Sequence, residues 1–450
     1  TRVGATVLGK SPDALPAGVG VSESCAGITI RTPSPAIAPA TNAASSGKAN
    51  RIRRLGVLIP HRLYRRRPVG EVKVRLRFGV AQRLQWPSLN SHDIAHWRMR
   101  NLGLSEPPFE APEAVVRWLG AVQSQDYSPA KWSVAERTRG VSDAAMDQAF
   151  ADGAILRTHV LRPTWHFVLP ADIGWMLELT APRVQALNAY HYRRLELDDT
   201  VLEQCNALLV SVLRGGNQLT RKALAAVLEG AGIVTSGFRL AYILMNSELH
   251  GIICSGALNG KQHTYALLDE RAPPAKRLTH EKALAELTLR YFSSHGPATA
   301  KDFRWWSSLA AAEVKTGLEM VASQLMHEVI DGVTYWFSTT PPSSKAASPT
   351  VHLLQGYDEY IVGYSESKYV LDVSGATRSQ PQDKAVFNHV VILDGQVAGH
   401  WKRTLKRGSV IVEVALHTPF DDAQTQALQA AADRHGAFLG LTATLVHTEL

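Results

Sequence analysis

Apolar residues recur at spacings of three and four from about residue 91 onward, in stretches separated by short polar breaks. This period puts them on one face of a helix and predicts helices over Asp93 to Leu102 and Ala111 to Val122. Leu156 to Leu169 alternates instead and is rich in β-branched residues, which predicts a pair of strands. Helices followed by a hairpin are typical of a winged-helix unit, which we place at residues 86–195.

The same order of helices and hairpin returns twice. The second copy ends in two strands joined around Asn259-Gly260, and the third in a hairpin that turns at Asp331-Gly332. Gly296-Pro297-Ala298-Thr299 precedes a helix of the third copy as a cap. We therefore expect further winged-helix units at residues 196–275 and 276–340. The predicted helices are Asp199–Leu213, Arg221–Leu228, Phe238–Leu249, Leu278–Ser293, Ala300–Ser307 and Ala310–Met326.

The pattern changes again after a linker of Pro, Ser and Ala between Pro341 and Pro349. Short alternating runs predict strands, Asp394-Gly395 is a hairpin signal, and Asp421 to Arg434 is an amphipathic helix. We expect residues 350–450 to form a small β-barrel closed by a helix. The predicted fold class is thus α+β, with three tandem winged-helix copies followed by a C-terminal β-barrel. The predicted strands are Thr350–Leu354, Tyr360–Val362, Val386–Leu393, Gln396–Lys402, Val410–Leu416 and a last one around Thr442–His447.

Composition removes several classes of protein. No run approaches the roughly 18 to 20 apolar residues that a spanning helix needs, so no membrane partner is expected. The three cysteines lie far apart without a CxxC pair, which argues against an iron-sulfur cluster, a zinc ribbon or a disulfide framework. His92 and His96 have the spacing of a metal pair but no evident third ligand, so we predict no metal and no cofactor. A reducing, cytoplasmic compartment fits best.

The basic charge of the chain, +8 overall, is unevenly distributed. Residues 1–83 hold 15 basic and 3 acidic side chains, whereas the other 367 residues hold 33 basic and 37 acidic ones. A DNA-binding face on the folded part must therefore be a local basic patch. The first 50 residues lack hydrophobic periodicity, and we expect residues 1–85 to be a disordered or non-native extension, with a functional basic tail as the alternative.

The segment Gln123-Ser124-Gln125-Asp126-Tyr127 places polar side chains where the predicted helix ends. If the backbone is extended there, two carboxamides spaced by two point to the same side and can position one water molecule together. Their carbonyl dipoles also suit hydrolysis through an oxocarbenium-like sugar when the leaving base is already activated. A polar cap of the helix is the competing interpretation.

A second polar constellation lies in the predicted strand pair. Arg157, Arg162 and His166 can meet phosphates or support the glutamines, and Trp165 can stack on bases. The alternative is that the aromatic residue belongs to the core and that the histidine is structural.

Over residues 90–450 the sequence closely resembles the AlkZ-like winged-helix DNA glycosylases. The resemblance rests on the two polar segments above, followed in order by Gly296-Pro297-Ala298-Thr299 with Trp306, Asp358-Glu359-Tyr360 and Asp394-Gly395. The resemblance implies an enzyme that removes alkylated bases, often N7 adducts of purines or crosslinked bases, from double-stranded DNA. It implies Gln123 and Gln125 as the catalytic pair. It also implies a DNA-contacting hairpin, which we match to the strands around Asp394-Gly395. The DNA-binding residues predicted from this match are Lys402, Arg403, Lys406 and Arg407.

No lysine lies in the motif to form a Schiff base, so we expect a monofunctional glycosylase without lyase activity. Asp126 directly follows the glutamines, and we favour a structural over a catalytic role for it. We expect Tyr357-Asp358-Glu359-Tyr360 to join the barrel to the helical units. A monomeric, nucleoid-associated protein follows from the same picture. The alternatives are a non-catalytic winged-helix DNA-binding protein or transcriptional regulator, and an enzyme acting on a substrate other than nucleic acid.

Overall fold

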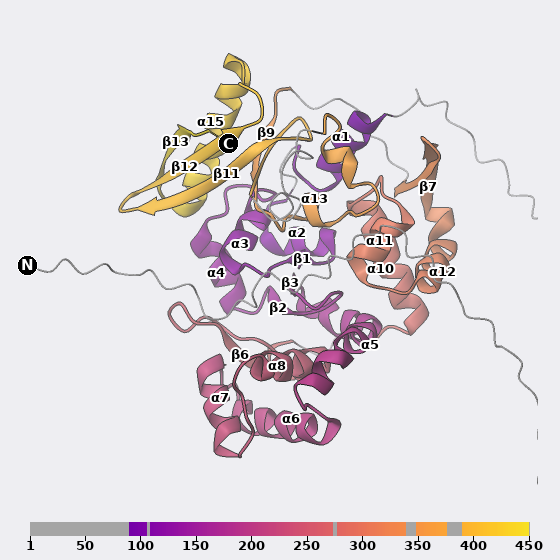
Figure 1. The fold of residues 1–450 in the computed structure, drawn as a ribbon, viewed down its shortest axis with the longest axis vertical. Coiled ribbons are helices and arrows are strands. Elements are labelled where there is room, and N and C mark those ends of the chain that lie inside the picture. The colour runs from indigo at the N-terminus through magenta and orange to yellow at the C-terminus, as the bar shows by residue number, and fades with distance from the viewer. Residues whose placement is uncertain (1–89, 106–108, 273–276, 339–347, 376–388, 450) are drawn as a thin grey trace, which may run out of the picture. The chain divides into compact units, whose positions relative to one another are not determined.

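The computed structural model describes residues 90–105, 109–272, 277–338, 348–375 and 389–449, which contain helices and four β-sheets (Figure 1). The predicted mixture of α and β structure is confirmed. The predicted extension over residues 1–85 lies outside the described residues. None of the helices in these ranges is both long and apolar enough to cross a membrane.

The first segment folds as helices around a three-stranded sheet with the order β1-β3-β2. Gly120 ends the second helix with φ +82, a conformation that glycine adopts at no steric cost, and turns the chain into the sheet. A helix of 25 residues that the sequence did not predict then leaves the sheet, with Pro182 inside it. The elements are α1 (Ser91–Asn101), α2 (Pro112–Leu119), β1 (Val122–Gln123), α3 (Tyr127–Ala135), α4 (Asp143–Ala151), β2 (Leu156–His159), β3 (Trp165–Val168) and α5 (Pro170–Arg194).

The second segment repeats this plan with the sheet order β4-β6-β5. Its first two helices begin where the sequence predicts, the third begins one residue later, at Arg239, and a short fourth helix was not predicted. The Thr220 side chain caps the second helix by accepting from Ala223 N. Leucine and isoleucine side chains of this segment form an apolar core of their own. The elements are α6 (Asp199–Leu213), β4 (Leu219–Thr220), α7 (Arg221–Gly230), α8 (Arg239–Leu249), β5 (Ile253–Ser255), β6 (Thr264–Leu267) and α9 (Leu268–Arg271).

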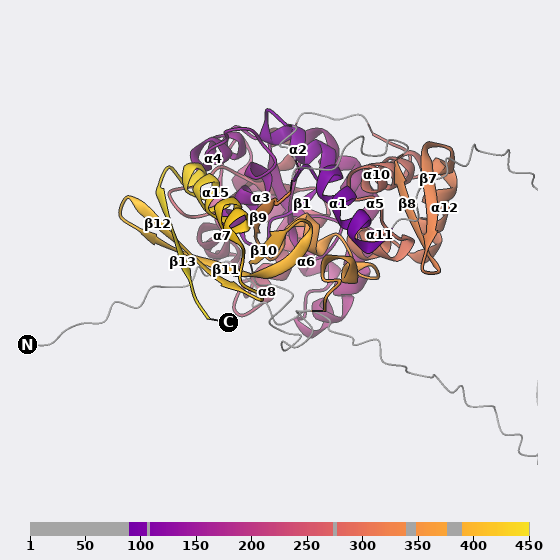
Figure 2. The ribbon, with the colours of Figure 1, turned by 90° about the horizontal axis from the view of Figure 1, so that it is seen from above.

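The third segment has a two-stranded sheet, and Ala298 adds an isolated bridge to Trp336 beside it. Thr299 forms a capping box with Asp302, as the Gly-Pro-Ala-Thr motif predicts. The hairpin turns at Asp331-Gly332, both with positive φ. Figure 2 groups these helices and strands at one side of the described chain. They are α10 (His280–Ser294), α11 (Ala300–Ser307), α12 (Ala311–Val321), η1 (Ala322–Gln324), β7 (Leu325–Ile330) and β8 (Val333–Ser338).

The C-terminal segment departs from the predicted barrel. Its five strands form one sheet in the order β13-β12-β11-β10-β9, so the first and last strands are both edges within the described residues. The last strand pairs in parallel, because helix α15 carries the chain back across the sheet and packs on it instead of a closing strand. The elements are β9 (Val351–Leu354), α13 (Glu359–Val362), η2 (Lys368–Leu371), β10 (Val390–Leu393), β11 (Gln396–Lys406), β12 (Ser409–Leu416), α15 (Asp422–Leu439) and β13 (Thr442–His447).

The predicted strand over Tyr360 to Val362 is wrong. These residues lie in the short helix α13, which Asp358 caps by accepting from Tyr360 N. All four residues of the helix are buried, so a continuous apolar run reflects burial here and not a strand. One apolar core joins the first and third segments to the C-terminal sheet, and α13 lies within it through Tyr360 and Ile361.

Candidate active site

Strand β1 carries the first glutamine of the motif into a sheet. Gln123 pairs with His166 of β3, and Ser124 N continues the pairing to Trp165 O at 2.7 Å. The backbone is therefore extended at Gln123, as the same-side argument for the two glutamines requires, and it bends at Gln125. Gln123 is 6% exposed, whereas Gln125 is half-buried. The competing interpretation as a helix cap does not hold, because α2 ends at Leu119, before the motif.

Arg162 and His166 lie against Gln123, as predicted for supporting residues. Arg162 Nη2 donates to Gln123 Oε1 at 2.7 Å and to His166 Nε2 at 3.3 Å, and Nη1 donates to Trp306 O at 3.4 Å. His166 Nδ1 donates to the Thr164 carbonyl at 2.9 Å, so Nε2 is free to accept. Leu161, just before Arg162, has φ +63, a costly conformation for a bulky residue.

Burial sets the protonation of this pair. It lowers the pKa of His166 well below its usual value, and the Arg162 charge lowers it further, so the imidazole is neutral. Burial also lowers the pKa of Arg162, while the nearby carboxylate of Glu359 raises it. A guanidinium retains its charge even so. The site thus contains a buried cation fixed on an amide oxygen.

Arg157 holds the backbone of the motif. Its Nε donates to Ser124 O at 3.1 Å and its Nη2 to Gln125 O at 3.3 Å, and the guanidinium lies 4.3 Å from the ring centroid of Trp165. The predicted base contact of Trp165 does not fit this structure. The indole is 5% exposed, is covered by Arg157 and donates to Glu248 Oε1 at 3.3 Å, so neither ring face is open to a base. Trp165 instead fits the alternative interpretation, in which the aromatic residue belongs to the core.

Asp126 occupies the N-cap of α3 but makes no capping hydrogen bond. Its side chain is exposed. The surrounding protein raises the pKa of its carboxyl by desolvation, and the charge of Arg157 opposes the increase. The Asp126 carboxylate thus does not cap helix α3, although it occupies the N-cap position.

Sequence analysis did not assign Glu359 to this site. Glu359 is fully buried; Oε1 accepts from Gln123 N at 2.8 Å, and Oε2 accepts from Trp306 Nε1 at 2.9 Å and lies 3.4 Å from His295 Nε2. The available signal was two adjacent acids inside an otherwise apolar run, since buried charges need partners. The neighbouring Asp358 forms a buried ion pair with Arg137 at 2.7 Å, which is the kind of joining contact that the segment was predicted to make.

Gln123, Arg162, Trp306 and Glu359 close a ring of four hydrogen bonds, called here the Gln123 ring. Arg162 binds the Gln123 side chain and the Trp306 carbonyl, while Glu359 binds the Gln123 N–H and the Trp306 indole. A cation and an anion thus hold the same glutamine from two sides. The ring gathers residues from β1, the β2–β3 loop, α11 and α13.

The four residues of the C-terminal segment that were predicted to contact DNA differ in their exposure and in their partners within the protein. Lys406 and Arg407 are exposed at the end of β11 and in the turn that follows. Lys402 is exposed and pairs with Glu413 at 3.2 Å. Arg403 instead donates to Ser128 Oγ at 2.9 Å and lies 3.3 Å from His435 Nε2, which ties β11 to α3 just after the glutamine motif.

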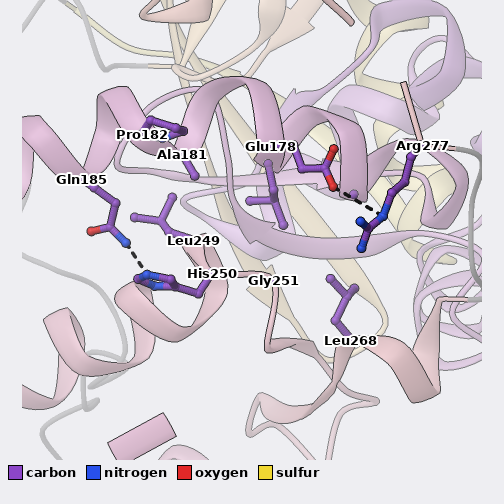
Figure 3. A pocket seen from close by; sticks show the side chains of 11 residues that line it. Glu178, Ala181, Pro182, Gln185, Leu249, His250, Gly251, Leu268 and Arg277 are labelled. Carbon is purple, nitrogen blue, oxygen red and sulfur yellow. Dashed lines mark hydrogen bonds and ion pairs between the residues drawn. The ribbon is translucent and has the colours of Figure 1, made fainter. Parts of the chain in front are cut away.

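A pocket of about 450 Å³ lies along α5 and at the end of α8 (Figure 3). Glu178 and Arg277 face each other at its rim, and Gln185 contacts His250. None of the predicted site residues lines it. Among the described residues, no cluster of three or more His, Cys, Asp or Glu side chains is placed to hold a metal ion.

Comparison with known proteins supports the resemblance of the motifs. The chain is 23% identical over 347 residues to an interstrand DNA cross-link repair glycosylase of Streptomyces sahachiroi, covering 74% of this chain and 91% of that protein. The solved structure of the Streptomyces sahachiroi DNA glycosylase AlkZ matches with a TM-score of 0.66 at 22% identity, covering 80% of this chain and all of that one. The sequence model of the family described as "DNA glycosylase AlkZ-like" matches residues 116–438. The chain therefore belongs to the AlkZ-like DNA glycosylase family.

Proposed function

We propose that this protein is a monofunctional DNA glycosylase that hydrolyses the N-glycosidic bond of alkylated purines, with Gln123 and Gln125 as its catalytic pair. The observation that carries the proposal is the Gln123 ring. Burying a cation and an anion costs folding free energy, and charged groups buried in this way are concentrated at functional sites. The similarity to a glycosylase named for interstrand cross-link repair extends the proposed substrates to crosslinked bases.

The chemistry is hydrolysis at an activated leaving group. Alkylation at N7 makes a purine cationic, so departure of the base needs no strong acid, and amide side chains are sufficient to assist it. Arg157, Arg162 and His166 act by holding the glutamines. Because no lysine lies in the motif, the reaction leaves an abasic site without cutting the strand.

We propose the repeated order of elements as three winged-helix units, over residues 86–195, 196–275 and 276–340. Each has a short strand or bridge just before a helix, followed later by a hairpin, as the sheet orders support. With the C-terminal segment, residues 350–450, they would bind duplex DNA as a monomer, with Lys402, Lys406 and Arg407 near phosphates. A cytoplasmic location at the nucleoid fits this role.

The test is release of N7-methylguanine from a duplex by the double variant Gln123→Ala with Gln125→Ala. We expect excision to fall by about 1000-fold or more, with duplex affinity retained. Gln424 and Gln426 repeat the same spacing on α15 and serve as the matched control, since their double alanine variant should excise normally. Normal release by the Gln123 and Gln125 variant contradicts the assignment. Duplex binding without excision by the unaltered protein favours the regulator instead.

Lyase activity is tested in the same reaction. Borohydride should trap no protein on the abasic product, and the strand should stay intact until heated with alkali. A trapped adduct would contradict the monofunctional mechanism while leaving base release unaffected.

A further inference from the structure

The two glutamines of the motif are anchored by their amide oxygens. Arg162 Nη2 lies 2.7 Å from Gln123 Oε1, and Trp165 N lies 3.3 Å from Gln125 Oε1. A guanidinium and a backbone N–H only donate, so the oxygen of each amide must face its anchor. Within the described ranges, neither amide nitrogen has an acceptor from the protein, and neither is among the buried polar atoms that lack a partner, so both nitrogens keep contact with solvent, unlike the covered indole of Trp165. The nitrogens are therefore the groups left for a ligand.

The hydrogen bonds of the Gln123 ring fix this orientation of the amide. If the Gln123 amide flipped, its nitrogen would face the guanidinium of Arg162, and two donors would meet in a buried place. The backbone is equally constrained, because Glu359 Oε1 accepts the Gln123 N–H at 2.8 Å and is itself held by the Trp306 indole. Both ends of the residue are thus fixed by charged groups.

We infer that Gln123 acts as a hydrogen-bond donor, through its amide nitrogen, to an acceptor atom of the alkylated base, and that Glu359 is the residue that positions it. The inference rests on the proposed function and assigns one atom its task. It differs from the role suggested by the spacing alone, in which both glutamines hold one water. Two donors on one water would occupy both of its lone pairs and leave none to attack the sugar.

The reaction step gives a donor a clear use. The bond between C1′ and the base nitrogen breaks, and its electron pair stays on the base. The oxygen of a water molecule then bonds to C1′ and loses one proton to solvent. As the electron pair moves onto the base, acceptor atoms such as N3 and O6 become more negative, so a donor placed there binds the transition state more tightly than the substrate. This leaves Gln125, which is half-buried, to orient the water.

Gln123→Glu separates a donor from an acceptor. Glutamate keeps the length of the side chain and an oxygen for Arg162 but has no N–H to offer. We expect single-turnover excision of N7-methylguanine by Gln123→Glu to fall by about 100-fold, as far as for Gln123→Ala, with unchanged duplex affinity. Excision by Gln123→Glu close to that of the unaltered enzyme overturns the inference. Normal excision by Gln123→Ala contradicts the proposed function itself.

The unaltered enzyme gives an independent test that does not depend on folding of the glutamate variant. Duplexes carry alkylated analogues that lack either N3 or O6 as an acceptor, and each enzymatic rate is divided by the spontaneous release rate of the same base. We expect one analogue to lose about 100-fold of this acceleration. Equal acceleration of both analogues and the natural base overturns the donor role.

Glu359→Gln tests the positioning residue, with Asp358→Asn as the control at the neighbouring buried acid. We expect Glu359→Gln to lower the single-turnover rate by about 10- to 100-fold at saturating enzyme, with duplex affinity unchanged. Glu359→Asp keeps the charge and should recover part of the rate. Asp358→Asn should lower the melting temperature but not the rate of the folded fraction. If Glu359→Gln changes only the melting temperature, the positioning role is wrong.

Discussion

The β1-β3-β2 and β4-β6-β5 sheets have the same strand order, each with a two-residue edge strand followed by a helix and a later hairpin. Their surroundings differ sharply. Gln123 of β1 faces Arg162 and, through its backbone, Glu359, whereas the residues around the second sheet form a core of leucine, isoleucine and cysteine with one tyrosine, Tyr265. One architecture thus serves as a scaffold in the second segment and, with polar residues inside it, as a candidate catalytic centre in the first.

The largest expected difference concerns buried charge. Arg137, which follows α3 beside the first sheet, forms a fully buried ion pair with Asp358. Asp358→Ala should destabilise the protein by about 3–5 kcal/mol, because it leaves the buried guanidinium without its carboxylate. Replacing both partners, Arg137→Met with Asp358→Leu, should restore most of this loss. Urea denaturation measures both. A single variant as stable as the parent would mean that the pair is not buried in solution.

Leu209→Ala is the counterpart in the second core, where Leu209 is fully buried. We expect a loss of about 2–5 kcal/mol from the cavity, with excision by the folded protein unchanged. A variant that loses excision while folded would show that the second core acts on the site and would remove the contrast between the two regions.

Acidification should also affect the two regions unequally. Burial lowers the pKa values of His166 and His295, so both are neutral in the fold, whereas the unfolded chain takes up these protons below pH about 6.5. The unfolded state therefore binds more protons, and stability present above that pH is lost as the pH falls. Hydrogen exchange at pH 5 and 7.5, corrected for intrinsic rates, should reveal weaker protection of β2 and β3 at pH 5, and little change in α6 of the second core, which contains no histidine. Equal loss of protection in α6 would contradict this.

The smallest expected effects lie at the helix N-caps. Thr220 caps α7 by a side-chain hydrogen bond, so Thr220→Ala should cost about 1 kcal/mol. Asp126 at the corresponding start of α3 makes no such bond, and Asp126→Ala should change stability by less than about 0.5 kcal/mol. Melting temperatures compare the two. A larger cost for Asp126→Ala would reveal a structural role of the carboxylate.

Local patterns predicted much of this fold. The capping box at Thr299, the turns at Asp331-Gly332 and Asp394-Gly395 and the bounds of α6 follow from short-range geometry, which the sequence carries directly. The long helix α5 was missed, because a proline at position 182 usually ends a helix. The open C-terminal sheet was missed because closure depends on long-range pairing, which alternation does not encode.

The candidate site divides in the same way. Gln123, Arg162 and His166 lie within one hairpin and its neighbouring strand, and their proximity could be predicted. Glu359 lies 236 residues after Gln123, and nothing local links the two. The covered indole of Trp165 likewise depends on Glu248 from a distant helix.

The Gln123 ring has a consequence for biosynthesis. Its members stand at positions 123, 162, 306 and 359, so a ribosome must release most of the chain before the Gln123 N–H finds its carboxylate. A polypeptide that stops after the first two segments contains Gln123 and Arg162 but lacks Trp306 and Glu359. A chain that ends before residue 359 therefore lacks the carboxylate that accepts the Gln123 N–H.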